Sequence, residues 1–521
     1  MGVDALSEWR PRSNPWLIAM AVMLGTFMEV LDTSVANVAL PHIAGNLSAS
    51  VDESTWVLTS YLVSNAIILP ASGWLGRFFG RTRFLLVCIG IFTASSVLCG
   101  AAESLGMLIV ARIIQGVGGG ALQPIAQAVL LESFPPRKRG IAMGVYGIGV
   151  VVAPIVGPTL GGWITDNYSW RWIFYINLPV GILAALMVRA FVEDPPYITR
   201  AARGTIDYIG FGLMAVWIGT LQIILDKGQE DDWFAAPWIR WFALVSAVAF
   251  VAFVARQLVT REPLVDLRIF RNRNFALGTM LIAVVGLVLY GTTAMLPQFL
   301  QTLLGYPALD SGLAVSPRGF GSIVAMVFVG RAVGIIDSRL LLAIGFGLVA
   351  VSSFMLGDIN LNIGMVSVVV PNIINGLALG FLFVPLTTVA MGTLRPEQIG
   401  NATGIYNLMR NLGGSFGISA VTTLLARKAQ VHQAMLAAHV TPYDPATQGW
   451  LARVTAALAL KVGPVAAAQQ ALGLLYATVV KQATLLAFVD TFRLLGFLCL
   501  VCIPSVFLLR KARAAGSVAL H

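Results

Sequence analysis

Two carboxylates lie inside the first long apolar stretch of the chain. Glu29 and Asp32 interrupt the segment 16–40, which otherwise consists mostly of apolar residues. A carboxylate at the centre of a membrane helix costs about 3 kcal/mol on insertion scales, so it needs a partner, water or a proton. The i, i+3 spacing places both side chains on one helix face, where each disfavours ionisation of the other. Carboxyl groups in this setting can bind and release protons.

The composition of the whole chain indicates an integral membrane protein. Of its 521 residues, 57% are hydrophobic and 11% are charged, and the mean hydropathy is +0.82. Soluble domains carry about a quarter charged residues. Apolar segments recur at the length of about 20 residues that crosses a bilayer as a helix. We count about fourteen such segments, which predict an all-α protein: 16–40, 54–76, 84–102, 106–131, 141–163, 171–192, 205–225, 236–258, 275–303, 312–335, 339–357, 365–391, 399–426 and 485–510.

The net charge of +10 does not indicate a nucleic-acid partner, because the basic residues fall in alternate loops and form no single patch. Basic loops orient a membrane protein with that side in the cytoplasm. Both termini are therefore expected to be cytoplasmic, since basic residues flank the first and last spans. No cleavable signal peptide is expected, because Arg10 and Arg12 precede a long apolar span that lacks a small-residue cleavage site.

Cysteines and histidines give no sign of a metal, a cofactor or a disulfide. All four cysteines fall within predicted spans, and the four histidines are scattered. The chain has no GxSxG elbow, no P-loop lysine and no HExxH helix, so neither an enzyme nor an ATP-driven pump is predicted. The glycine-rich run 116–120 lies inside a span and is expected to serve close helix packing.

Motifs in the first and fourth spans resemble the fourteen-helix drug:proton antiporter branch of the major facilitator superfamily. From Leu31 to Pro41 the chain matches the pattern Leu-Asp-x-Thr-Val-x-Asn-Val-Ala-Leu-Pro, with serine in place of threonine. The segment from Arg112 to Gly116 resembles the family's buried arginine motif. The resemblance implies that Asp32, Glu29 and Arg112 couple transport to protons. A fixed ion pair between the first and fourth helices is the alternative.

Two further motifs support the resemblance. One, in the fifth span, looks like the antiporter motif of exporters and includes Pro154, Gly157, Pro158, Gly161 and Gly162. The other is the superfamily loop signature between the second and third spans, with Gly73, Arg77, Gly80 and Arg81. Arg77 stands where the family carries an aspartate, so the charge pair attributed to that aspartate does not transfer to this chain.

Several weaker patterns, in this order, are similar to the inner-membrane subunit of Emr-type multidrug efflux systems: Pro135-Pro136-x-Lys138-Arg139, Asp226-x-Gly228 with Asp232-Trp233-Phe234, and Pro385-Leu-Thr-Thr388. This similarity implies a major facilitator fold of two six-helix bundles, 14–200 and 262–513, with two inserted helices in 201–261. The polar interruption at about 427–484 is predicted to form short amphipathic helices on the periplasmic side. In such systems this region meets a periplasmic adaptor that leads to an outer-membrane channel. A solvated loop without a partner is the alternative.

Buried polar residues in the second half are additional candidates. Arg410, Asp490 and Arg493 have either a secondary coupling role or a structural one, and an Asp490–Arg493 pair is easy at i, i+3. Arg318 and Arg331 are expected near the two ends of their span, where they would snorkel or contact backbone carbonyls. Adaptable pockets combine apolar contacts with a few amides. The candidates for a substrate cavity are Tyr61, Gln115, Gln123, Tyr290, Gln298, Asn375, Phe383 and Asn407.

The sequence thus predicts a secondary transporter of the bacterial inner membrane. It would exchange protons for lipophilic drugs or toxic compounds by alternating access, in contact with membrane lipids and without a cofactor. Dedicated export of an endogenous metabolite, such as a fatty acid or a siderophore, is the competing transporter function. A membrane receptor or scaffold that does not transport is a third hypothesis, and a membrane enzyme is a more distant one.

Overall fold

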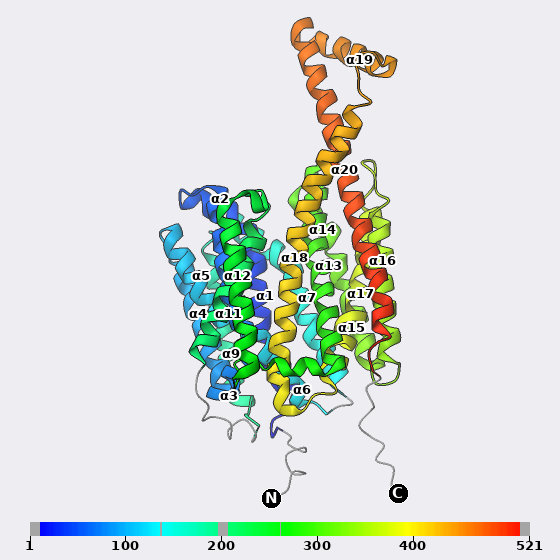
Figure 1. The fold of residues 1–521 in the computed structure, drawn as a ribbon. Coiled ribbons are helices and arrows are strands. Elements are labelled where there is room, and N and C mark those ends of the chain that lie inside the picture. The colour runs from blue at the N-terminus through cyan, green and yellow to red at the C-terminus, as the bar shows by residue number, and fades with distance from the viewer. Residues whose placement is uncertain (1–10, 136–137, 196–206, 261, 511–521) are drawn as a thin grey trace, which may run out of the picture.

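The structure is a computed structural model that describes residues 11–135, 138–195, 207–260 and 262–510. Almost all of the described chain is helical (Figure 1). The helices are α1 (Pro15–Asn46), α2 (Val51–Ser54), α3 (Trp56–Phe79), α4 (Arg81–Gly100), α5 (Leu105–Gly119), α6 (Leu122–Ser133), α7 (Arg139–Asn167), α8 (Trp172–Tyr175), α9 (Asn177–Phe191), α11 (Tyr208–Lys227), α12 (Pro237–Val259), α13 (Arg273–Thr302), α14 (Ala308–Val315), α15 (Pro317–Ala332), α16 (Ser338–Leu356), α17 (Val366–Met391), α18 (Pro396–Ala437), α19 (Pro445–Val462) and α20 (Pro464–Val506).

Thirteen described helical segments are long and apolar enough to cross a membrane. Helix α18 is longer than most of them and runs alongside them through the molecule (Figure 1), but it carries buried polar residues such as Asn401, Asn407 and Arg410. Helix α18 contains the whole of the predicted span 399–426. The prediction of about fourteen membrane helices is confirmed.

We call α1–α9 the N-terminal half and α13–α20 the C-terminal half. Within the N-terminal half, α1 packs on α7 and α9, and α5 packs on α3 and α4. Within the C-terminal half, α13 packs on α18, and α17 packs on α15 and α16. The inserted helices α11 and α12 pack on each other, and α11 also contacts α3 and α18. The domain boundaries near 200 and 261 lie outside the described residues and stay a prediction.

The two halves meet at the end of the bundle where the described termini lie, which we call the terminal end (Figure 1). A Cβ atom on Gly73, in the last part of α3, would lie 2.3 Å from the carbonyl oxygen of Gly400 at the start of α18. A Cβ atom on Gly140, at the start of α7, would lie 2.7 Å from the carbonyl oxygen of Gly330 on α15. Glycine at these positions lets the backbones of the two halves meet.

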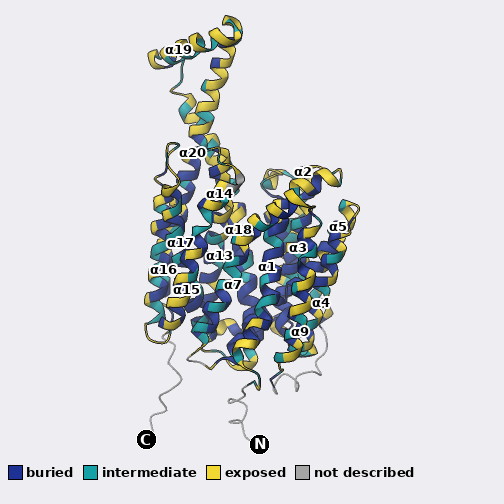
Figure 2. Ribbon diagram, turned by 180° about the vertical axis from the view of Figure 1, so that it is seen from behind, coloured by how far each residue is buried: buried dark blue, intermediate teal, exposed yellow. Residues whose placement is uncertain are grey.

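The polar region 427–484 differs from the expectation of short helices. Helices α18 and α20 continue without a break out of the bundle, and α19 joins them at the far tip (Figure 1). No proline or glycine interrupts 427–437, whereas Pro442, Gly463 and Pro464 lie at the ends of α19 and separate it from its neighbours. We call this projection, residues 427–484, the tower. Most of the residues of the tower are exposed (Figure 2).

Candidate functional site

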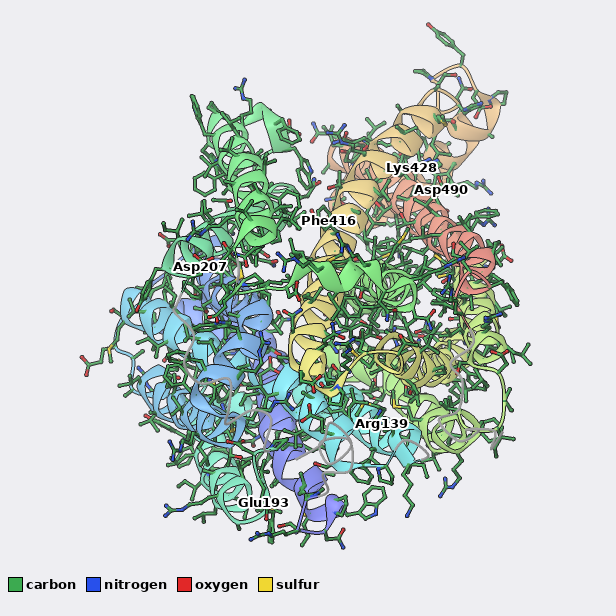
Figure 3. The ribbon with its side chains drawn as sticks, turned by 60° about the horizontal axis from the view of Figure 1, so that its bottom comes forward. Arg139, Glu193, Asp207, Phe416, Lys428 and Asp490 are labelled. Carbon is green, nitrogen blue, oxygen red and sulfur yellow. The ribbon has the colours of Figure 1, made fainter. Side chains whose placement is uncertain are left out.

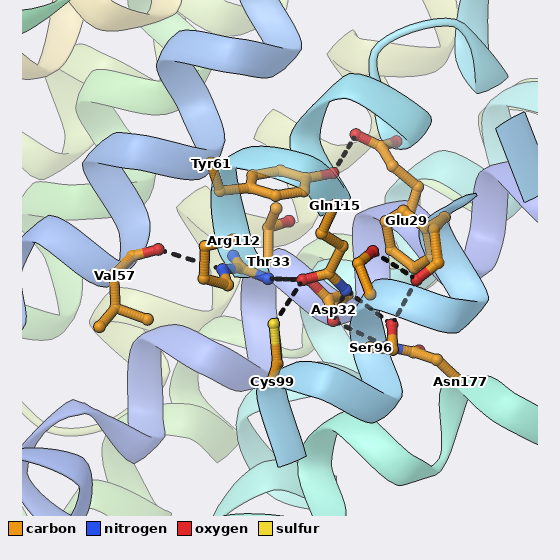
Figure 4. Close-up of polar contacts among 12 residues, drawn as sticks. Glu29, Asp32, Thr33, Val57, Tyr61, Ser96, Cys99, Arg112, Gln115 and Asn177 are labelled. Atoms are coloured by element: carbon orange, nitrogen blue, oxygen red, sulfur yellow. Dashed lines mark hydrogen bonds and ion pairs between the residues drawn. The ribbon is translucent and has the colours of Figure 1, made fainter. Parts of the chain in front are cut away.

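A buried ion pair joins the first and fourth membrane spans. Arg112 Nη1 on α5 donates to Asp32 Oδ2 on α1 over 2.5 Å, and both side chains are fully buried (Figure 4). The Arg112 Nε–H donates to the carbonyl oxygen of Val57 at 3.0 Å, and the Tyr61 ring centroid lies 4.2 Å from the guanidinium carbon. The predicted partnership of Asp32 and Arg112 is therefore present in the structure.

Asp32 has further donors that hold its carboxylate. Gln115 Nε2 donates to Asp32 Oδ1 at 2.9 Å, and Asn177 Nδ2 on α9 donates to the same oxygen at 2.7 Å. Both amides also donate to the Ser96 hydroxyl oxygen, at 2.8 and 3.2 Å. Gln115 thus belongs to the ion-pair network and does not line an open cavity. Ser96 and Asn177 do not stand out in the sequence, where each is only a polar residue within an apolar segment.

Small residues make this network sterically feasible. A Cβ atom on Gly116 would lie 2.0 Å from Ser64 Oγ, and one on Gly120 would lie 2.4 Å from the carbonyl oxygen of Asn65. The glycine-rich run therefore brings α5 against α3, as its composition predicted. The chain bends directly after this run, since α5 ends at Gly119 and α6 begins at Leu122.

The predicted antiporter motif packs directly on the helix that carries both acids. A Cβ atom on Gly157 would lie 2.4 Å from Ser34 Oγ, and one on Gly161 would lie 2.9 Å from a Val35 methyl carbon. Ser34 Oγ also donates to the carbonyl oxygen of Pro154. The regular helix donor for this oxygen would be the N–H of residue 158, which is a proline and has none. Pro158 is exposed and Gly162 has open space where a Cβ would lie. Glycine at 157 and 161 thus sets the distance between α7 and α1.

Glu29 belongs to a second network, one turn away from the ion pair along α1. Its carboxylate accepts hydrogen bonds from Tyr61 Oη at 3.3 Å, Asn65 Nδ2 at 3.2 Å and Gln123 Nε2 at 2.5 Å. Glu29 is 4% exposed and forms no ion pair with another described residue. The two acids of α1 therefore lie on one face but have separate sets of donors.

This second network crosses from one half to the other. Arg410 Nη2 on α18 donates to Gln123 Oε1, so a single amide lies between the Glu29 carboxylate and the Arg410 guanidinium. One turn earlier on α18, Asn407 Nδ2 donates to Gln127 Oε1 at 2.8 Å. Buried polar contacts thus link α6 to α18 near the middle of the molecule. Arg410 also lies 5.9 Å from the Phe383 ring centroid.

The eight candidates for a substrate cavity do not all meet at one place, although Phe383 and Gln123 both contact Arg410. Tyr61, Gln115, Gln123 and Asn407 are buried members of the two networks. Asn375 lies in a separate hollow of the C-terminal half. Tyr290 is 37% exposed, and Gln298 is exposed on the same helix.

The predicted pairing of Asp490 with Arg493 is wrong. Asp490 Oδ2 accepts from His432 Nε2 at 3.0 Å and lies 3.3 Å from Lys428 Nζ, both on α18. Figure 3 shows Asp490 and Lys428 close together beside the base of the tower. Arg493 instead contacts Asp358, after the end of α16, at 2.7 Å. Asp490 and Arg493 face different neighbouring elements, so each pairs with a residue of that neighbour and not with the other along α20.

The loop signature forms a charged cluster at the terminal end. Arg81 pairs with Glu132 at the end of α6. Gly80 has φ of 86°, a conformation that L side chains rarely adopt, and the Asp194 carboxylate beside it accepts from the Thr82 backbone N–H at 2.7 Å. Glu262 and Asp266, in the segment between α12 and α13, interact electrostatically with Arg77. Arg77, which stands where the family carries an aspartate, thus has acidic neighbours outside the N-terminal half.

Arg318 contradicts the expected snorkelling, whereas Arg331 agrees with it. Arg331 is near the end of α15, is exposed, and donates to the carbonyl oxygen of Val327 at 3.1 Å. Arg318 lies in the first turn of the same helix but is only 6% exposed. It points inward because Thr292 and Thr293 of α13 accept its guanidinium hydrogen bonds.

One acid outside the spans has a clear electrostatic setting. Asp207 caps α11 by accepting from the Gly210 backbone N–H at 2.9 Å, and it pairs with Arg256 at 2.7 Å. Burial alone would raise the pKa of Asp207, but hydrogen bonds from Gly210, Arg256 and Gln257 outweigh it and lower this pKa below its ordinary value. Figure 3 places Asp207 on the inserted helices, far from Asp490.

Among the described residues, no group of three histidine, cysteine or acidic side chains is arranged to hold a metal ion. The four cysteines are buried and free.

The fold and these buried networks define a polytopic membrane transporter of two helical halves. The Major Facilitator Superfamily model matches residues 22–418, and the chain belongs to this superfamily. The chain is 39% identical to the multidrug export protein EmrB of Haemophilus influenzae, over 83% of this chain and 85% of that one. It is 38% identical to EmrB of Escherichia coli K12, over 85% and 87%. The fatty acid resistance protein FarB of Neisseria gonorrhoeae is 36% identical, over 96% and 97%.

Solved structures share the fold at low sequence identity. The human organic anion transporter MFSD10 aligns with a TM-score of 0.62 at 13% identity, over 94% of this chain and all of that one. The proton:xylose symporter XylE aligns with a TM-score of 0.58 at 14% identity, over 94% and 96%. The predicted superfamily and fold class are thereby confirmed.

Proposed function

We propose that this protein is a proton-coupled antiporter that exports lipophilic drugs or toxic compounds across the bacterial inner membrane. The observation that carries the proposal is the pair of buried acids on α1, one held by Arg112 and the other hydrogen-bonded toward Arg410 of the opposite half. The similarity to EmrB proteins over more than four fifths of the chain supports drugs as the substrates.

Glu29 is the acid whose protonation would alter the contact between the halves. Its ionised form accepts three hydrogen bonds, one of them from Gln123, which also accepts from Arg410. A proton on Glu29 removes negative charge and one acceptor position, so it weakens the Gln123 bridge to α18. Proton uptake then favours separation of the halves, and proton release favours the arrangement described here.

Alternating access requires a second arrangement in which the terminal end opens. In the described arrangement the halves are in backbone contact there through Gly73 and Gly400. With the termini in the cytoplasm, as the basic loops predict, this arrangement is closed toward the cytoplasm. An inward-moving proton releases about 2.3 kcal/mol per 100 mV of membrane potential, which drives the return step.

The first test is proton release from purified protein on addition of a panel of lipophilic cations. Wild type is expected to release protons, and Asp32→Asn and Glu29→Gln are compared with it. Asp166→Asn serves as the control, because Asp166 is an exposed acid at the end of α7. Loss of release in a folded Asp32 or Glu29 variant assigns the coupling carboxyl. Unchanged release in both variants contradicts the proposed site, and no release from wild type contradicts the function.

Export of an endogenous lipophilic acid is the second candidate function. The similarity to FarB, which extends over 96% of this chain, favours it. The two functions differ in substrate competition. Several unrelated drugs compete with one another in a multidrug exporter, whereas a dedicated exporter responds to one acid and ignores the drugs.

We also propose that the tower meets a periplasmic adaptor that leads to an outer-membrane channel. Its helices present exposed apolar side chains, among them Leu460, Leu472 and Tyr476. Replacement of 440–462 by a flexible linker tests this partner. Drug transport in proteoliposomes should persist while drug resistance of cells is lost; resistance that survives the replacement contradicts the adaptor role.

A further inference from the structure

The C-terminal half contains a hollow with a buried arginine at its wall. It lies between α13, α15, α16, α17 and α20 and has a volume of about 10 Å³, and most of its lining is apolar, including Val285, Phe346 and Leu379. Arg318 and Asn375 are the polar side chains at the same wall. They are 6% and 5% exposed, so both are buried.

The hydrogen-bonding capacity of these two side chains is incompletely used. Arg318 Nη1 donates to Thr293 Oγ1 at 2.8 Å, and Nη2 donates to Thr292 Oγ1 at 3.2 Å. Arg318 Nε and Asn375 Oδ1 have no hydrogen-bond partner. The ion pairs among the described residues do not include Arg318. Its positive charge is therefore buried without a compensating acid, which is strongly unfavourable.

Close packing fixes the two side chains beside each other. A Cβ atom on Gly376 would lie 1.9 Å from the carbonyl oxygen of Arg318, and Ser322 Oγ donates to the carbonyl oxygen of Gly376 at 3.0 Å. Helices α15 and α17 thus meet at the residue next to Asn375. Arg318 and Asn375 are held at the closest approach of the two helices, which makes the site rigid.

We propose that this hollow is an anion-binding site in which Arg318 and Asn375 hold a monovalent anionic group. Arg318 supplies the charge and its free N–H groups, and a 180° rotation of the Asn375 amide directs its NH₂ group into the hollow as a second donor. Nothing in the proposed transport function requires this site, and none of its residues belongs to the Glu29 or Asp32 networks.

The size of the hollow limits what it can accept. A cavity needs about 10–15 Å³ to hold one water molecule, so a hollow of about 10 Å³ suits a halide ion or a single carboxylate oxygen of a larger molecule. Thr293, which bonds Arg318 on one side, is exposed on α13, in the same row as Tyr290 and Gln298. A carboxylate whose tail lies along this exposed row would reach the hollow past Thr293.

Direct binding measurements test the proposal and separate the two sources of the anion. Purified protein is dialysed against radiolabelled chloride and, separately, against radiolabelled octanoate, with octylammonium as the cationic counterpart. Wild type is expected to bind at least one of the two anions, and Arg318→Gln is expected to weaken that binding at least tenfold. Chloride binding identifies a halide site, whereas octanoate binding alone identifies a carboxylate subsite.

Matched variants keep the test decisive. Arg331→Gln removes an arginine from the other end of α15, where the side chain is exposed, and should bind the anion as wild type does. Asn375→Ala should weaken binding several-fold, and it replaces Arg318→Gln if that variant does not fold. Wild type that binds neither anion overturns the proposal. Equal binding by wild type and the folded Arg318 or Asn375 variant overturns it as well.

Discussion

The two halves treat their buried charges in different ways. In the N-terminal half, Arg112 and Asp32 neutralise each other, and the network also includes Gln115 on α5 and two side chains from other helices, Ser96 and Asn177. In the C-terminal half, the ion pairs of the described residues include neither Arg410 nor Arg318, although both are buried. The first centre contains its own counter-charge. In the second, Arg410 instead bonds a group of the other half.

Arg410 shows this dependence most directly. Its bond to Gln123 is made with the N-terminal half, and the amide links it to Glu29. A change in the distance between the halves therefore changes what Arg410 contacts, whereas both members of the Asp32–Arg112 pair lie within the N-terminal half. Arg410, which the sequence offers for a secondary coupling role or a structural one, is in contact with the Glu29 network.

The largest expected effect is from breaking the self-contained pair. Arg112→Gln leaves the Asp32 carboxylate buried without its cation and should reduce the free energy of unfolding by about 3–5 kcal/mol. The double variant Asp32→Asn, Arg112→Gln should recover part of this loss, because no unpaired charge remains. Thermal unfolding of the purified variants measures both effects. A double variant as unstable as the sum of the single variants would show that the two residues do not interact.

A smaller effect on stability, with a large effect on transport, is expected from Arg410→Gln. This change removes a buried cation that lacks an acid, so its cost should stay well below that of Arg112→Gln. Proton-coupled export should fall at least tenfold, because Gln123 loses its partner on α18. Transport in proteoliposomes and thermal unfolding are measured together, with Arg331→Gln as control. The contrast between the two halves is contradicted if Arg410→Gln unfolds the protein while Arg112→Gln does not.

Gly73→Ala should weaken the contact between the halves without touching either charged centre. The added Cβ would lie 2.3 Å from the Gly400 carbonyl oxygen, and overpacking of this kind costs about 1–3 kcal/mol. The population with an open terminal end should rise. A cysteine introduced in place of the buried Thr403 should then be alkylated faster, which measures the open population. Gly90→Ala is the control, since no atom lies near its added Cβ; equal labelling in the two variants would refute the prediction.

The smallest effect is expected from Asp490→Asn. This acid is a third exposed and contacts Lys428 and His432, a setting worth about 0–1 kcal/mol. The melting temperature should change little, and substrate-induced proton release should match wild type. Loss of release in this variant would move a coupling acid into the C-terminal half and would remove the contrast between the halves.

Much of the fold could be predicted because the length of an apolar segment depends only on consecutive residues of the chain. The segments of about 20 apolar residues mark the membrane helices, and thirteen of the fourteen also satisfy a strict measure of length and hydropathy in the structure. Helix α18 does not satisfy that measure, because Arg410 and its neighbouring amides lower its hydropathy. The tower was misjudged for a related reason: the polar composition of 427–484 indicates exposure but does not show where a helix stops.

Partners of buried side chains could be predicted only in part. The resemblance of the motifs around Asp32 and Arg112 pointed to a pair that the structure contains. The pair predicted from i, i+3 spacing, Asp490 with Arg493, is absent. Helix spacing indicates which groups are near one another along one helix, but it does not indicate which groups neighbouring helices present.

By itself, the sequence determined the class of the protein, its membrane helices and the identity of its costly buried acids, because composition, segment length and motif order are read along the chain. Tertiary structure alone decided that Gln123 stands between Glu29 and Arg410, and that Arg318 faces a hollow with Asn375. These contacts join residues up to 287 positions apart. Their partners are set by how closely glycine lets the helices approach and by which faces then meet.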